Sequence, residues 1–354
     1  MVKDFYSKKK IFITGHTGFK GSWLCRLLLE LGADVYGYSL QPTPEQQLYD
    51  LSGIKNNITS YYGDIRDFDY LMDCVKQSEP DIIFHLAAQP LVLESYGNPI
   101  YTYSTNVMGT VNILEAARKC SNLLSVINVT TDKVYYNRET KDGYVEDDIL
   151  NGYDPYSNSK SCSELVTSSY RNSFFSKTDI AVSTCRAGNV IGGGDFSKNR
   201  IIPDCYRAVS SGQNIVLRNP NSVRPYQHVL DPLYAYLLTA QKQCLSKEKY
   251  EGSYNIGPDK DSNITTGKLA DLFCTAWGNG AGWISEQNNI TAHEANLLYL
   301  NCDKAKKHLG WSAVWDIKET VEKTVDWYLC YHNGDNVELC IQKQINEFIK
   351  EALV

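Results

Sequence analysis

A glycine-rich segment near the N-terminus restricts the possible folds of this chain more than any other feature. The apolar run 11–13 leads into Gly15, Gly18 and Gly21, and an amphipathic stretch over 22–31 follows. This order is typical of a strand, a tight turn and a helix. The glycines let the backbone approach a pyrophosphate closely, and the positive end of the next helix favours that anion. The segment therefore predicts a dinucleotide-binding unit; the alternative is a glycine turn without a ligand.

Strand-like and helix-like patterns alternate through the first half of the chain. We expect strands over 11–14, 34–40, 58–63, 81–86, 124–130 and 180–187, and helices over 18–31, 68–77, 101–118 and 156–171. This alternation predicts an α/β fold with a doubly wound parallel Rossmann sheet. Beyond Arg186 the pattern breaks into glycine, asparagine and proline turns. We expect a smaller mixed α/β C-terminal domain there, which would carry substrate specificity.

The expected division is a first domain of residues 1–187, with about 225–250 added, and a second domain of 188–224 and 251–354. An amphipathic helix over 336–354 is expected to pack on the body of the protein.

Composition indicates a cytoplasmic enzyme. The chain has 354 residues with 43% hydrophobic content, and no stretch long enough to span a membrane or resembling a secretory signal. Its eleven cysteines, without a Cys-x-x-Cys pair, favour reduced thiols. A net charge of −6 argues against nucleic acid as the main partner. The six histidines lack metal-ligand spacing, so we expect no metal.

The segment 151–160 places Tyr156 and Lys160 four residues apart at the start of a predicted helix. A tyrosine hydroxyl with a pKa of about 10 acts as a base near neutrality only if a nearby cation favours its phenolate. A lysine one turn later can supply that cation. The pattern also occurs by chance in helices, so its context decides.

That context is a polar group at the end of the fifth predicted strand. Thr131, Asp132 and Lys133 follow the run 125–130. Ligands bind at the carboxyl edge of parallel sheets, which is where these residues should lie. A turn cap or a solvated ion pair is the alternative for each residue alone. Beside Tyr156 and Lys160, they predict an active site.

These residues belong to segments that resemble a known family over nearly the whole chain. The segments are GHTGFKGSWL at Gly15, HLAAQPLV at His85, TNVMGTVNILEA at Thr105, TTDKVY at Thr130, YDPYSNSK at Tyr153, RAGNVIGGGDF at Arg186, RPYQHVLDPL at Arg224 and YNIGP at Tyr254. The chain resembles the extended short-chain dehydrogenase/reductase superfamily and, within it, is similar to the CDP-glucose 4,6-dehydratases. Lysine after the aspartate distinguishes this group from the related dTDP-glucose and GDP-mannose dehydratases.

The resemblance implies an NAD-dependent dehydration of CDP-glucose that makes deoxy sugars for a bacterial surface polysaccharide. Tyr156 would accept the C4 hydroxyl proton, assisted by Lys160 and Thr131. Lys133 would then remove the C5 proton while Asp132 protonates the leaving C6 hydroxyl. The division of acid and base between Asp132 and Lys133 stays open, because two coupled groups can share a proton.

The resemblance also assigns cofactor and substrate residues. The NAD set is Gly15, Thr17, Gly18, Phe19, Lys20, Gly21, Asp64, Ile65, Ala87 and Ala88, with Tyr156 and Lys160. The nucleotide-sugar set is Asn189, Arg207, Arg224, Asn255 and His293. Arg207 could equally be a surface residue, and His293 a structural hydrogen-bonding residue. The second predicted strand ends without an acidic residue for the ribose, so we expect NAD to bind weakly.

One segment departs from the family pattern. Leu93 and Glu94 stand where an arginine is usual, in a loop that borders the sugar, which leaves the exact hexose open. A related epimerase or reductase, or a member that binds without catalysis, is the alternative. An epimerase would not need Asp132 and Lys133, and a non-catalytic member would not need Tyr156 and Lys160.

The superfamily pairs its subunits through two long helices, and the resemblance therefore implies a homodimer or a dimer of dimers. The predicted helices are 101–118 and 156–171. Their apolar side chains could form the seam or pack on the sheet instead; these are Val107, Leu114, Ala116, Ala117, Leu165 and Val166.

Overall fold

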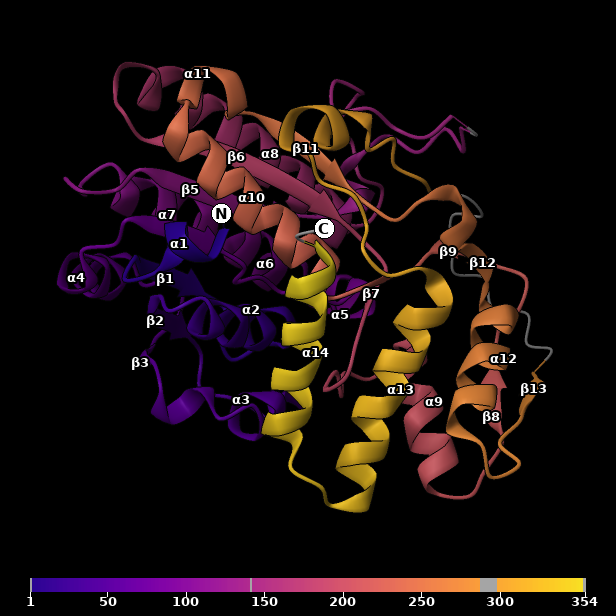
Figure 1. The fold of residues 1–354 in the computed structure, drawn as a ribbon. Coiled ribbons are helices and arrows are strands. Elements are labelled where there is room, and N and C mark those ends of the chain that lie inside the picture. Colours follow the sequence, from indigo (N-terminus) through magenta and orange to yellow (C-terminus); the bar gives the residue numbers. More distant parts are fainter. Residues whose placement is uncertain (1, 141, 287–297, 353–354) are drawn as a thin grey trace.

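A parallel sheet forms the centre of the computed structural model, which describes residues 2–140, 142–286 and 298–352. Seven strands pair in the order β3-β2-β1-β4-β5-β6-β11 (Figure 1). Their bounds are β1 Lys10–Thr14, β2 Asp34–Ser39, β3 Thr59–Tyr62, β4 Ile82–His85, β5 Ser125–Thr130, β6 Ala181–Ala187 and β11 Ser253–Ile256. The strand order reverses direction beside β1, the switch point at which ligands bind in such sheets. The predicted doubly wound α/β fold is confirmed.

Helices cover both faces of this sheet (Figure 1). On one face lie α4 (Phe68–Ser78), α7 (Gly109–Ala117) and α8 (Pro155–Ser173), packed on a core that includes Phe12 and Val126. On the other face lie α2 (Phe19–Glu30) and α10 (Leu230–Leu245), on a core that includes Ile11 and Ile13. Neighbouring residues of β1 thus point to opposite cores, which explains why its sequence is apolar throughout.

The remaining helices and strands extend this body. The helices are α1 Val2–Tyr6, α3 Leu48–Leu51, α5 Val92–Gly97, α6 Pro99–Tyr103, α9 Ile201–Ser210, α11 Lys247–Tyr250, α12 Thr266–Trp277, α13 Ile317–Asn333 and α14 Val337–Ala352. Three small sheets pair β7 (Val190–Ile191) with β10 (Gln227–His228), β8 (Ile215–Leu217) with β13 (Trp283–Ser285), and β9 (Val223–Pro225) with β12 (Asn263–Thr265). Figure 1 shows α9, α12, β8 and β13 grouped beyond one end of the main sheet.

Two features differ from the sequence-based expectations. The strand β11 belongs to the main sheet, although residues 251–354 were expected in the second domain. The predicted helix 101–118 consists of α6, a π-helical turn over Ser104–Met108, and α7. In this turn the Asn106 amide bonds the backbone nitrogen and oxygen of Gln89, at 2.8 and 3.1 Å. Single π-helical turns inside α-helices occur frequently at functional sites.

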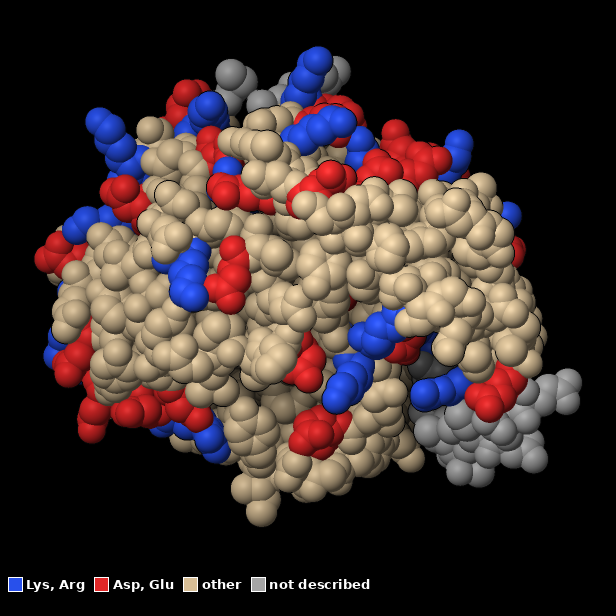
Figure 2. Space-filling view, turned by 90° about the horizontal axis from the view of Figure 1, so that it is seen from below, with Lys and Arg blue, Asp and Glu red and all other residues tan. Residues whose placement is uncertain are grey.

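Two surface properties complete the description. No helix of the described ranges is apolar over a length that would cross a membrane. On the face below that of Figure 1, Lys and Arg side chains lie among Asp and Glu side chains around a broad area of other residues (Figure 2).

Candidate active site

The end of β5 presents a hydrogen-bonded group of polar side chains. The Asp132 carboxylate accepts bonds from the Thr131 hydroxyl and from Lys133 Nζ, both at 2.9 Å to Oδ1. Its other oxygen accepts from the Asn189 amide at 2.9 Å. Burial alone would raise the pKa of Asp132, but the Lys133 charge and these bonds outweigh it and hold that pKa below its usual range. Burial lowers the pKa of Lys133, but the Asp132 carboxylate more than offsets this and leaves it raised.

The first turn of α8 brings Tyr156 to the same group. The helix begins at Asp154, whose carboxylate accepts from the Ser157 backbone nitrogen at 3.0 Å, and Pro155 occupies its first position. Burial raises the pKa of Tyr156, while the Lys133 charge and a hydrogen bond with Thr131 counteract part of that effect. The Tyr156 hydroxyl therefore lies within hydrogen-bonding reach of Thr131 and close enough to Lys133 to be affected by its charge.

Lys160 is buried one turn further along α8. Its ammonium donates to the backbone oxygen of Val129 at 3.2 Å. Burial lowers the pKa of Lys160 to about 8, and the Glu164 carboxylate counteracts that shift. The cation that acts most on Tyr156 is Lys133 rather than Lys160, because Lys160 is anchored on β5.

The glycine turn after β1, called the cradle below, contains Gly15, Gly18 and Gly21. Gly15 has a φ of +79°, and a Cβ on it would lie 2.8 Å from the backbone nitrogen of Ala87. A Cβ on Gly21 would lie 2.1 Å from the Gly15 oxygen, so glycine is required at both positions. Gly18 caps α2 without a side-chain bond, and the first helical turn, which includes Phe19 and Lys20, has no acidic residue. No acidic residue of this turn therefore competes with an anionic ligand for the positive end of α2.

Other residues expected at the cofactor lie along the same sheet edge. Thr17 bonds the Ser39 hydroxyl at 2.8 Å, where an acid would usually follow the second strand. The Asp64 carboxylate is bonded by Arg66 at 2.9 and 2.6 Å, and Ile65 is buried. Ala87 and Ala88 follow β4 and are half-buried.

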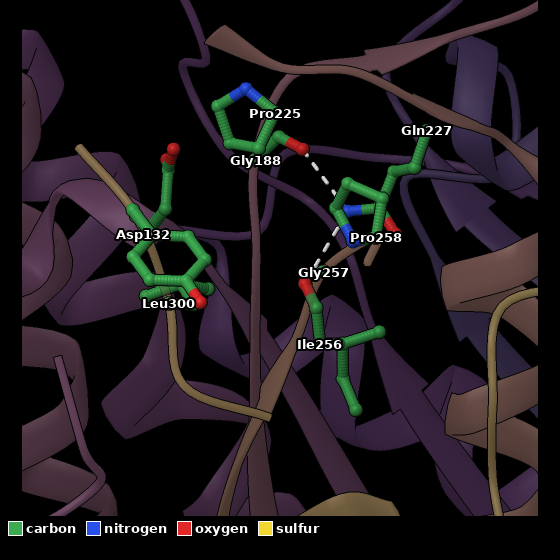
Figure 3. A pocket seen from close by; sticks show the side chains of 9 residues that line it. Asp132, Gly188, Pro225, Gln227, Ile256, Gly257, Pro258 and Leu300 are labelled. Carbon is green, nitrogen blue, oxygen red and sulfur yellow. Dashed lines mark hydrogen bonds between the residues drawn. The ribbon is translucent and has the colours of Figure 1, made fainter. Parts of the chain in front are cut away.

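A cavity lies beside Asp132 (Figure 3). Its lining is Asp132, Gly188, Pro225, Gln227, Ile256, Gly257, Pro258, Tyr299 and Leu300. The Gln227 amide nitrogen bonds the backbone oxygens of Gly188 and Ile256, at 3.1 and 3.3 Å. A Cβ at Gly188 would lie 2.0 Å from the Asp132 carboxyl carbon, so glycine makes room for that side chain.

Of the residues expected around the nucleotide sugar, two act on Asp132 and one lies on α9. Asn189, with a φ of +50°, bonds Asp132, and the Arg224 charge acts on both Asp132 and Lys133. Arg207 lies on α9 and bonds the backbone oxygens of Phe196 and Ser197, both at 3.2 Å.

Asn255 lies in the interior of the protein. Its side chain is completely buried and bonds Tyr135, Tyr144 and Asn301. A contact of Asn255 with the nucleotide stays a prediction. His293 lies outside the described residues.

Arg200 is a site residue that the sequence analysis missed. It precedes α9, and its guanidinium bonds the Asp195 carboxylate at 2.9 Å. Its charge acts on Tyr156 and on Lys20. Burial, followed by the Arg200 charge, lowers the pKa of Lys20 to about 7. The only sequence signal was an arginine between a glycine turn and a helix start, which is too common to be specific.

The chain matches known proteins over most of its length. The family model described as GDP-mannose 4,6 dehydratase matches residues 12–324. The chain is 44% identical over 352 residues to the CDP-glucose 4,6-dehydratase of Salmonella typhimurium strain LT2, covering 98% of each chain.

Solved structures support the fold at lower identity. The UDP-glucose 4-epimerase of Thermotoga maritima with UDP-glucose has a TM-score of 0.77 at 22% identity, covering 91% of this chain and 99% of that one. The UDP-glucose 4-epimerase of Brucella ovis with NAD has a TM-score of 0.76 at 21% identity, covering 90% and 98%. With the family match over most of its length, the chain belongs to the GDP-mannose 4,6-dehydratase family.

Proposed function

We propose that this chain catalyses the NAD-dependent dehydration of CDP-glucose to CDP-4-dehydro-6-deoxyglucose. The Asp132–Lys133 pair, held beside Thr131 and Tyr156, is the observation that carries the proposal. An acid and a base next to a tyrosine base suit an oxidation followed by an elimination. The similarity to a CDP-glucose 4,6-dehydratase supports this nucleotide and hexose.

The residues at the sheet edge fit NAD. The cradle of Gly15, Gly18 and Gly21 leaves the backbone open to a pyrophosphate, and the first turn of α2 adds its dipole and Lys20. Thr17 and Ser39 offer hydroxyls in place of a ribose-binding acid, which supports weak binding. When bound, NAD⁺ supplies the chemistry of hydride removal from C4 and hydride return to C6.

In the oxidation, Tyr156 accepts the proton of the C4 hydroxyl. Its phenolate is favoured by the Lys133 charge and by the Thr131 hydrogen bond. Arg200 adds a further positive charge. The Lys160 ammonium lies one turn of α8 after Tyr156, where the family resemblance places the nicotinamide ribose.

In the elimination, Lys133 removes the C5 proton and Asp132 protonates the leaving C6 hydroxyl. The pair lies in the form of an ammonium and a carboxylate joined by a bond of 2.9 Å. Transfer of one proton along that bond gives a neutral amine and a protonated carboxyl without changing the net charge. The C5 proton then goes to Nζ, the C6–O bond breaks, and water leaves with the proton of Asp132.

The expected second domain, residues 188–224 and 251–354, is proposed to bind the nucleotide sugar. Arg224 and Asn189 lie next to Asp132, where a diphosphate arm would leave the hexose at the acid–base pair. Arg207 remains a proposed contact further along α9. We also infer a cytoplasmic enzyme of deoxy-sugar synthesis, because all eleven cysteines are free thiols.

The direct test is incubation of the purified chain with CDP-glucose, with and without added NAD⁺. We expect a 4-keto-6-deoxy product, detected by its alkaline absorbance, and a rate that rises with added NAD⁺. Matched reactions with dTDP-glucose and GDP-mannose should give much less product. Comparable rates with either would contradict the assignment of the nucleotide, and conversion of CDP-glucose to an isomer without loss of water would favour an epimerase.

A homodimer is also proposed, through α6, the π-helical turn and α8. Leu114, Ala116 and Ala117 are buried against the sheet and cannot form its seam. The exposed apolar side chains on these elements are Ile100 at 85%, Tyr103 at 36%, Met108 at 51% and Leu165 at 56%. Side chains of this kind on adjacent helices are suited to a second copy of the chain.

Replacing Leu165 and Ile100 with aspartate should convert the dimer to a monomer. Light scattering measures the mass, and circular dichroism shows whether the variant is folded. Charges on exposed positions leave the sheet core intact, so the fold should persist. A wild-type mass of one chain, or an unchanged mass of the double variant, would contradict this interface.

A further inference from the structure

A buried carboxylate lies below the proposed active site and takes no part in the reaction described above. Glu164 belongs to α8, one turn after Lys160, and its side chain is 2% exposed. Oε1 accepts from the Thr130 hydroxyl at 2.5 Å, and Oε2 accepts from the Thr184 hydroxyl at 2.7 Å and from Arg186 at 2.8 Å. Glu164 therefore joins α8 to both β5 and β6.

Two of these contacts lead directly to the reacting groups. Thr130 is the last residue of β5 and immediately precedes Thr131 and Asp132. The Lys160 ammonium bonds Val129, the residue before Thr130. The end of β5 is thus held from the same helix at two consecutive residues, by the ammonium of Lys160 and the carboxylate of Glu164.

Glu164 is also the acidic group that acts on Lys160. Among the described residues, the other titratable groups that interact with Lys160 are Lys20 of α2, which carries the same sign of charge, and His85 of β4. Burial, with a small contribution from Lys160, lowers the pKa of His85 to about 3, so His85 is neutral. Arg186 of β6 binds Glu164. It also donates to the Tyr135 hydroxyl at 2.6 Å.

We propose that Glu164 is a positioning residue that holds the end of β5 against α8 and supplies the counter-charge for the Lys160 ammonium. This inference rests on the proposed function, in which Tyr156 accepts the C4 hydroxyl proton and Lys160 lies at the nicotinamide ribose. A buried ammonium without a nearby carboxylate loses its proton at lower pH, and Lys160 then no longer offers a positive charge at the proposed place of the nicotinamide ribose. Glu164 thereby sets the alkaline limit of activity.

The test replaces Glu164 with glutamine and measures activity and the Lys160 titration against pH. We expect the alkaline limb of kcat to move to a pH about one unit lower, as for the loss of one opposite charge nearby. NMR of protein with isotope-labelled lysine reports the same change at Lys160, with Lys160→Arg to assign the signal. The NMR readout does not depend on turnover, so it tests Glu164 even if CDP-glucose is not the substrate.

Two further variants separate the counter-charge from simple stabilisation. Thr184→Val removes one hydrogen bond to the same carboxylate but leaves its charge, so it should lower the melting temperature without moving the alkaline limb. The double variant Glu164→Gln with Arg186→Gln removes both buried charges. It should regain stability relative to Glu164→Gln alone, because no unpaired guanidinium remains, and it should keep the shifted limb.

The outcomes are distinct. A Lys160 titration and an alkaline limb that stay at the wild-type pH in folded Glu164→Gln protein would overturn the proposal and leave Glu164 as a structural residue. A shift of the same size in Thr184→Val would also overturn it. Inactive wild-type protein with a shifted Lys160 titration would instead reject the proposed function and retain the role of Glu164.

Discussion

Replacement of Tyr156 with phenylalanine is expected to lower the rate of keto-sugar formation by about a hundred- to ten-thousand-fold. The change removes one oxygen and with it the base for the C4 hydroxyl proton, which is the range that general base catalysis contributes. The ring remains on α8, so the fold and the cradle around Gly18 should be unaffected. Product formation under saturating CDP-glucose and NAD⁺ measures the loss, and thermal unfolding shows that the variant is folded.

Tyr153 offers a matched control three residues earlier. Its side chain is 80% exposed, and the same change to phenylalanine should leave the rate unchanged. If Tyr156→Phe retained most of the activity, another group would have to accept the C4 proton, and the proposed mechanism would be wrong at its first step.

Asp132→Asn should separate the oxidation from the elimination. Asparagine fills the same space and keeps an oxygen for Asn189, but it cannot supply the proton for the C6 hydroxyl. The loss of the carboxylate charge removes an effect that raises the pKa of Tyr156, so C4 oxidation should persist. We expect NADH to accumulate and dehydration to fall by about a hundred-fold or more. The absorbance of NADH after rapid mixing measures its accumulation, and the keto-sugar yield measures the loss of dehydration.

Comparison with Lys133→Met then assigns the acid and the base. In deuterated water, the C5 hydrogen should exchange in Asp132→Asn, which keeps the Lys133 amine, and should not exchange in Lys133→Met. The opposite pattern would make Asp132 the base and Lys133 the acid. Both variants alter the same buried pair, so each variant serves as the control for the effect of the other on folding.

The sequence predicted the parts of the fold that local pattern determines. The glycine turn, the apolar strands and the polar group after β5 are each contained within about ten residues, so spacing and periodicity were sufficient. The predicted helix start at Tyr156 lies within the first turn of α8 and also came from one short segment.

Long-range contacts account for what was missed. Tyr6 lies before the first predicted strand, where no helix was predicted, yet it forms the end of α1 and donates to the Leu237 oxygen at 2.8 Å. Arg200 is 44 positions after Tyr156 in the sequence, and no local pattern indicates that its charge acts on that tyrosine. Asn255 lies in a segment shared with the family, but its bonds to Tyr144 and Asn301 could not be read from spacing.

The main sheet is completed out of sequence order, which has a consequence for synthesis on the ribosome. The strand β11 pairs with β6, and α10 packs on β5 and β6, where the Gln243 amide bonds Ser125 and Ala181. During translation β6 therefore emerges with an apolar face that stays uncovered until α10 has been made to Leu245, and with an edge that stays open until the chain has been made to Ile256. Such an edge is a template for wrong pairing between nascent chains. We expect the first lobe to remain a client of chaperones until β11 has emerged, rather than to fold as a finished unit on its own.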